Sequence, residues 1–184
     1  RYEFDVGIEL DSFWKKLVLG VHTGDFEIMV SNYMGDDSRI LLQRNIYDRV
    51  GRIAPFLLLD PDAHLLVDSD GELYYHLSGV TEASRYPYSY RDYYAPGYLS
   101  DSVKAFVKAD TGDVQFYIIN DADPMVQTYS KIYPGLFIDG KEMPADFEEH
   151  LIYPESLFMV QMNIFSRYQM SDYQAFYQKE DLWM

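Results

Sequence analysis

The sequence predicts an α+β fold, with an antiparallel sheet of about four strands flanked by N-terminal and C-terminal helices. Helix-like apolar spacing occupies the first third of the chain, two strand pairs occupy the middle, and helix signals return in the last third. This order is typical of α+β domains. A parallel sheet is disfavoured because no long helical segment separates the predicted strands.

Two helices are expected in the first third. Asp11 and Ser12 can cap a helix that ends near Gly24. Its predicted apolar face consists of Phe13, Trp14, Leu17, Val18 and Val21. A second helix is predicted over residues 36–53, because an apolar stripe recurs there every three or four residues and Pro55 then ends it.

Two β-hairpins are expected in the middle third. Strands at residues 64–67 and 72–77 flank one turn rich in Asp and Gly, and strands at residues 102–109 and 114–119 flank another. In the second hairpin alternate side chains are apolar, which predicts one apolar face formed by Val103, Ala105 and Val107.

In the last third of the chain we expect helices that begin at prolines. Asp123 followed by Pro124 is a cap with proline at the first helical position. Pro144 begins a short segment, and Pro154 begins a longer helix. The side chains that align along this longer helix are Leu157, Val160, Ile164 and Tyr168.

A loop of roughly 20 residues, 81–100, is expected between the hairpins, and loops of this length are often functional. Tyrosine and arginine, which dominate binding hot spots, are concentrated in it. The candidate binding residues are Tyr86, Tyr88, Tyr90, Arg91, Tyr93 and Tyr94. The alternative is that these tyrosines pack the loop onto the sheet, each hydroxyl finding a partner.

Acidic side chains cluster around the first hairpin turn and suggest calcium as a possible cofactor. Hard cations take clustered oxygen ligands, and the candidate ligands are Asp60, Asp62, Asp68 and Asp70. The alternative is turn chemistry, since Asp also stabilises tight turns through its own backbone. No other cofactor is predicted.

The chain is acidic and has no cysteine. Its 184 residues carry 15 basic and 30 acidic side chains, a net charge of −15. Such a charge repels phosphate backbones, so we expect no nucleic-acid partner. Disulfides and thiolate metal sites are excluded. The chain begins at Arg1 without a signal pattern and has no long apolar run, so we expect a single soluble domain, residues 1–184, excised from a larger protein.

Short motifs run through the chain in one order over about residues 7–183. They include Ile53-Ala54-Pro55-Phe56-Leu57, Asp60-Pro61-Asp62, Asp70-Gly71-Glu72-Leu73-Tyr74, Tyr86-Pro87-Tyr88-Ser89, Asp101-Ser102-Val103-Lys104-Ala105, Tyr133-Pro134-Gly135-Leu136-Phe137 and Tyr153-Pro154-Glu155-Ser156-Leu157-Phe158. With this series the chain resembles the bacterial membrane proteins of uncharacterised protein family 0182.

The resemblance implies a multi-pass membrane protein with N-terminal spans followed by a large hydrophilic region. This chain would belong to that region, at the cell membrane and on its extracytoplasmic side, attached to the membrane only through the missing spans. The implied partners are the rest of its own chain or an envelope protein. No activity is implied, so no catalytic residue is carried over.

Three functions stay open from the sequence. A non-catalytic interaction domain is favoured, because the chain has no Gly-x-Ser-x-Gly elbow, zinc motif or phosphate-binding loop. A PAS-like small-molecule sensory domain is the alternative, by analogy of helix and hairpin order. An enzyme acting on envelope polymers would need two carboxylates facing each other, about 5–9.5 Å apart.

Overall fold

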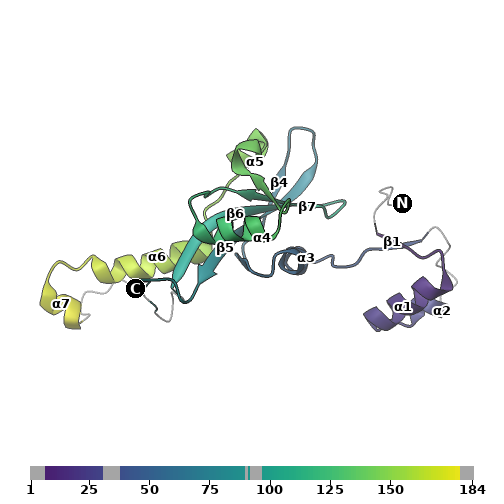
Figure 1. Ribbon diagram of the computed structural model, residues 1–184, viewed down its shortest axis with the longest axis horizontal. Coiled ribbons are helices and arrows are strands. Elements are labelled where there is room, and N and C mark those ends of the chain that lie inside the picture. Colours follow the sequence, from purple (N-terminus) through teal and green to yellow (C-terminus); the bar gives the residue numbers. More distant parts are fainter. Residues whose placement is uncertain (1–6, 31–37, 90, 92–96, 179–184) are drawn as a thin grey trace. The chain divides into compact units, whose positions relative to one another are not determined.

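The computed structural model describes residues 7–30, 38–89, 91 and 97–178 (Figure 1). The chain divides into two compact units, Arg1–Asn45 and Ile46–Met184. The single domain expected from the sequence stays a prediction. In the part of the chain that is described, no helix has both the length and the apolarity needed to cross a membrane.

The first unit pairs two short strands beside two helices. Strand β1 (Ile8–Glu9) runs antiparallel to β2 (Arg39–Ile40), and α1 (Phe13–Thr23) is followed by α2 (Glu27–Val30). Gly24 ends α1 with a φ of 74°, a conformation that glycine adopts at low cost.

The helix predicted from Ser12 to Gly24 is confirmed, but its buried side chains differ from the expected ones. The core of this unit consists of Leu10, Leu19 and Ile28. Four of the five residues of the predicted face are exposed: Phe13, Trp14, Val18 and Val21. Apolar spacing therefore predicted the position of the helix correctly, but it did not predict which side of the helix is buried in this unit.

The second predicted helix, over residues 36–53, is wrong from Ser38 to Asn45, and residues 36 and 37 lie outside the described residues. Helix α3 covers only Ile46–Ile53, and residues before it form β2. Ser38 accepts a backbone hydrogen bond from Leu10 in this strand pairing. Gln43 has a φ of 55°, which a continuous right-handed helix does not allow.

The second unit contains a six-stranded mixed sheet. The expected antiparallel sheet of about four strands is therefore wrong in the number of strands and in their direction. The order is β3-β5-β6-β7-β8, with β4 also paired to β5, and the pairing of β7 with β8 is parallel. The strands are β3 (Leu58–Leu59), β4 (His64–Val67), β5 (Leu73–Ala83), β6 (Tyr98–Lys108), β7 (Val114–Ile118) and β8 (Phe137–Asp139). The two strands of this sheet that sequence reasoning missed, β3 and β8, have two and three residues, too few to show a periodicity.

Both predicted hairpins are present, and their central strands are longer than expected. Gly71 and Gly112 have φ values of 81° and 75° in the two turns. Because β5 extends to Ala83 and β6 begins at Tyr98, the connection between them is shorter than the predicted loop of residues 81–100.

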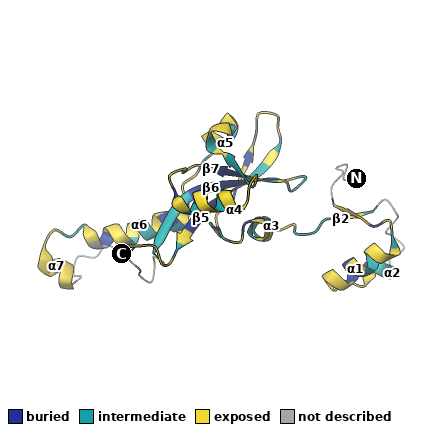
Figure 2. Ribbon diagram, in the orientation of Figure 1, coloured by how far each residue is buried: buried dark blue, intermediate teal, exposed yellow. Residues whose placement is uncertain are grey.

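The sheet is covered on both faces. On one face Leu77, Val103, Ala105, Val107 and Phe116 pack against α3 and α4 (Pro124–Ile132). The predicted apolar face of the second hairpin is therefore confirmed. Figure 2 shows these central strands as the most buried part of the unit.

The opposite face is covered by α5 (Ala145–Glu149), which follows a 3-10 turn at Gly140–Glu142. Phe106 and Phe147 stack there with ring centroids 4.1 Å apart, beside Leu66 and Tyr117. Two further helices end the described chain, α6 (Glu155–Tyr168) and α7 (Tyr173–Gln178). The segment that leads into α6 lies on this second face of the sheet, because Ile152 accepts a hydrogen bond from Lys104 of β6.

Candidate functional site

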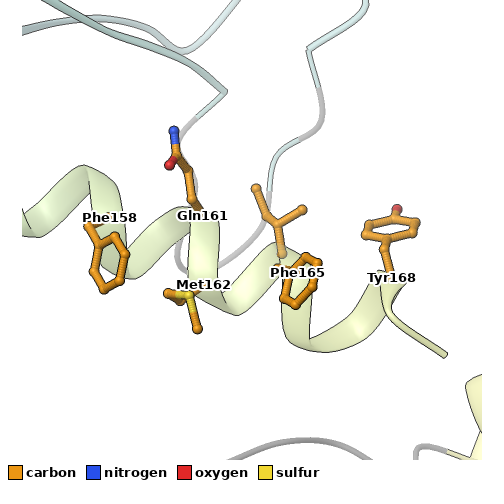
Figure 3. A pocket seen from close by; sticks show the side chains of 6 residues that line it. Phe158, Gln161, Met162, Phe165 and Tyr168 are labelled. Atoms are coloured by element: carbon orange, nitrogen blue, oxygen red, sulfur yellow. The ribbon is translucent and has the colours of Figure 1, made fainter.

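Helix α6 presents apolar side chains to solvent. Phe158, Met162 and Phe165, here called the outer face of α6, are 50%, 42% and 56% exposed. Figure 3 shows Phe158 and Met162 on the same side of the helix and Gln161 on the other. The outer face forms part of a shallow groove of about 550 Å³. An apolar helix side left in solvent is unfavourable, and exposed patches of this kind mark interaction surfaces.

The opposite side of α6 lines a second cavity, of about 460 Å³. Leu157, Val160 and Ile164 contribute from the helix. Across from them are side chains of the β5–β6 connection and the start of β6: Tyr86, Pro87, Tyr88, Ser89, Tyr98 and Leu99. Helix α6 is therefore apolar on both sides, a pattern that is typical of buried helices.

The first turn of α6 is fastened to the sheet by Asp60. The Asp60 carboxylate accepts hydrogen bonds from the backbone N–H of Ser156 (3.0 Å) and from its hydroxyl (2.6 Å). A negative charge at a helix N-terminus satisfies free N–H groups and suits the helix dipole. Burial alone would raise the pKa of Asp60, but the hydrogen bonds from Ser156 and Asp62 outweigh it and hold that pKa below its ordinary value.

A buried lysine holds the residues just before α6. Lys104 is 1% exposed, and its ammonium donates to Ser78 Oγ (2.7 Å) and Ile152 O (2.8 Å) and pairs with Asp101 (2.9 Å). These three contacts use all three ammonium hydrogens. Burial lowers the pKa of Lys104 and raises the pKa of Asp101, so it opposes both charges, and their mutual contact offsets only part of this effect. We call Asp60, Ser78, Asp101 and Lys104 the buried charge cluster.

The pair Ser78 and Lys104 resembles in distance the Ser-Lys pairs that some hydrolases use as nucleophile and base. Here Ser78 is only 4% exposed, and a Lys104 ammonium that donates all its hydrogens cannot accept the proton of the serine. The arrangement therefore holds the segment before α6 against the sheet.

His76 lies next to this cluster without a hydrogen bond. It is 1% exposed, and among the described residues neither of its ring nitrogens, nor Asp101 Oδ1, has a partner. Its ring packs on Phe106 with centroids 5.1 Å apart and on His64 at 6.4 Å. Burial first, and then the charge of Lys104, lower the pKa of His76 to about 4.

A second buried carboxylate anchors the ends of β5 and β6. Asp123 accepts hydrogen bonds from the hydroxyls of Thr81 and Ser102, from Tyr98 OH (2.9 Å) and from the backbone N–H of Met125 (2.9 Å). The last bond is the predicted cap of α4. Burial would raise the pKa of Asp123, but these hydrogen bonds outweigh it and lower that pKa.

Replacing Asp123 with asparagine is expected to lower the free energy of unfolding by about 1–3 kcal/mol, because an amide cannot accept from every one of these donors. Urea unfolding measures the change. Asp121→Asn is the matched control, since Asp121 is exposed and its side chain caps no helix, and it is expected to change little. Equal losses in the two variants would contradict the anchoring role.

Three of the six predicted binding residues lie among the described residues. Tyr86 stacks on Tyr98, with ring centroids 4.5 Å apart, and is partly exposed. Tyr88 is 108% exposed and has a φ of 60°, a strained conformation for a bulky side chain that is often kept at binding sites. Arg91 is exposed. The other three, Tyr90, Tyr93 and Tyr94, lie outside the described residues.

The structure does not bring the four predicted calcium ligands together. Asp60 binds α6, Asp62 contacts His64, and Asp68 accepts backbone hydrogen bonds from Asp70 and Glu72 inside its own turn. The last of the four, Asp70, is exposed. Within the described ranges, no group of three or more His, Asp or Glu side chains could hold a metal ion.

Sequence reasoning missed the buried charge cluster and the outer face of α6. One signal was available for the cluster. Successive side chains of a strand point to opposite faces of the sheet, so Lys104 shares a face with Phe106, opposite the face of Val103 and Ala105. A lysine at such a position needs a buried partner.

Comparisons with known proteins identify a family. A family model described as "Uncharacterised protein family (UPF0182)" matches residues 1–184. A "UPF0182 protein" of Desulforamulus reducens is 39% identical over 184 residues, covering 100% of this chain and 20% of the relative. One of Pelotomaculum thermopropionicum is 40% identical over 182 residues, covering 99% and 20%.

A further relative, from Salinibacter ruber, is 39% identical over 188 residues. The chain spans about one fifth of the length of these relatives. No solved structure matches it. The family model covers the whole chain, in agreement with the series of motifs in the sequence, and the chain therefore belongs to the uncharacterised protein family UPF0182.

Proposed function

We propose that this chain is a non-catalytic interaction domain and that the outer face of α6 is its main docking surface. The observation that carries the proposal is the exposure of Phe158, Met162 and Phe165. They belong to a helix whose first turn and preceding segment are hydrogen-bonded to the rest of the unit. A helix that is already formed before binding loses less conformational entropy on docking than a disordered segment.

The strained, exposed Tyr88 supports the same role. It lies at the cavity on the other side of α6, so the helix and the β5–β6 connection together offer a continuous area for contact. Tyrosine gives a large contact area at a low cost in side-chain entropy. The candidate residues Tyr86 and Tyr88 belong to this secondary surface.

Hydrogen exchange tests the docking role. In the full-length family protein, the amides of the second half of α6 are expected to exchange about tenfold more slowly than in the 184-residue chain, because a bound partner suppresses local opening. Helix α4 is the internal control, since its outward side chains include the polar Gln127, Thr128 and Lys131. Equal exchange of α6 in both proteins would contradict the proposal.

We further infer that the domain lies outside the cell membrane, next to membrane spans elsewhere in the protein. The resemblance to multi-pass membrane proteins supports this placement. Because the 184 residues contain no cysteine, a single Ser84→Cys substitution at an exposed position supplies a specific label. Labelling of intact cells by a membrane-impermeant maleimide, above that of the unsubstituted protein, is expected; labelling only after lysis would contradict the placement.

A small-molecule sensory role is the second candidate, and the cavity of about 460 Å³ favours it. Its volume and its aromatic and aliphatic lining fall in the range of small-molecule sites. A thermal-shift screen of amino acids, sugars and organic acids distinguishes the two functions. A ligand whose effect is lost in Leu157→Ala would support the sensor, and the absence of any shift would leave docking as the function.

A further inference from the structure

The outer face of α6 has the spacing of a helix-packing seam. Phe158, Met162 and Phe165 are separated by four and three residues, so their side chains form one row about 10 Å long. Rows of this kind pack into the grooves of a neighbouring helix. The groove beside them is shallow, which suits a rod-shaped partner and does not enclose a small molecule.

The same segment is free of charge. Residues 156–166 contain no Asp, Glu, Lys or Arg, although 24% of the chain is charged. The side chains of this segment therefore offer no ion pair to a partner, and the surface suits a partner with apolar side chains. Methionine at the centre of the row adapts to the shape of such a partner.

Two observations decide which partner this is. A second copy is disfavoured because each copy carries a net charge of −15 and repels the other. A segment of the same polypeptide is favoured because the curated relatives are about five times longer than this chain. Such a segment is present at high effective concentration, so it needs no strong intrinsic affinity.

We propose that the outer face of α6 receives an apolar helix from another part of the same polypeptide, packed along Phe158, Met162 and Phe165. This inference rests on the proposed docking function and names its partner. The buried charge cluster holds the start of the helix, because Asp60 binds Ser156 and Lys104 binds Ile152, so the row of side chains begins beside the sheet.

Site-specific photo-cross-linking in the full-length family protein tests the inference. A benzophenone amino acid replaces Phe165 in one variant and Phe158 in a second, and Lys131, exposed on α4, in the control. After illumination, we expect several-fold more cross-linking at both α6 positions than at the control, with the protein still migrating as a monomer. Mapped peptides should come from an apolar segment outside these 184 residues, with helical spacing of its apolar side chains.

Other outcomes overturn the inference in distinguishable ways. A cross-link to a second copy or to another protein would show that the surface docks a different partner, while the docking function itself stands. A cross-link to a segment of the same polypeptide whose apolar side chains lack helical spacing would refute the proposal that the partner is a helix, but not that the partner is part of the same polypeptide. Cross-linking at the level of the control, together with unprotected α6 amides in hydrogen exchange, would overturn both the inference and the docking function.

Discussion

Replacing Lys104 with methionine is expected to lower the free energy of unfolding by about 3–5 kcal/mol, because it leaves buried carboxylates without their cation. Asp101 loses the ammonium at 2.9 Å, Asp60 loses a nearby positive charge, and Ile152 O loses its donor. Methionine fills a similar volume, so the loss of stability measures the removal of the charge and its hydrogen bonds and does not include the cost of a cavity. Chemical denaturation at neutral pH measures it.

Two comparisons separate this effect from a general intolerance of substitution. Lys108→Met changes a lysine on the same strand and the same face, whose ion pair with Glu72 is solvent-exposed, and is expected to have a much smaller effect. The double variant Lys104→Met with Asp101→Asn is expected to lose less than the sum of the two single variants, because the two side chains interact. A Lys104→Met variant as stable as the parent would refute the cluster as the fastening of α6.

Lowering the pH from 6.5 to 4 is expected to destabilise the fold through His76 by about 3 kcal/mol. The folded pKa of about 4 lies below the ordinary value of 6.5. In this window the unfolded chain binds a proton that the folded chain does not, so the free energy of unfolding falls as the pH falls. Above pH 6.5 the histidine is neutral in both states and contributes no pH dependence, and below pH 4 its contribution levels off.

The difference between the parent and a variant isolates this contribution from that of the carboxylates. His76→Leu and His76→Gln are both expected to lose the acid sensitivity due to His76, as measured by urea unfolding at several pH values between 7 and 4. At pH 7 the leucine variant should be at least as stable as the parent, because it removes buried nitrogens that have no partner. Parallel pH profiles for parent and variants would contradict the low pKa.

The features that the sequence predicted correctly are local. The hairpin turns at residues 68–71 and 110–113, the cap at Asp123 and the helix after Ser12 each depend on neighbours within a few residues. The alternation of Val103, Ala105 and Val107 also identified one buried face of the sheet. Period and capping are properties of short segments, so they can be read without knowing the fold.

The features that it did not predict involve residues far apart along the chain. Asp60 and Ser156, separated by 96 positions, meet only because β3 and the start of α6 are placed beside the same part of β5 and β6. The parallel pairing of β7 with β8 requires the chain to pass through α4 before it returns to the sheet. No local pattern encodes either arrangement.

The outer face of α6 shows both kinds of information at once. The sequence by itself predicted an apolar helix that begins at Pro154, with Leu157, Val160 and Ile164 in line, in an acidic α+β chain, and α6 (Glu155–Tyr168) confirms the helix. Only the tertiary structure decided which of its apolar side chains are covered. Since Asp60 and Lys104 fasten the first turn to the sheet, Leu157 is buried while Phe158, Met162 and Phe165 are left in solvent. Burial depends on what packs against a side chain, which the spacing of a single helix does not specify.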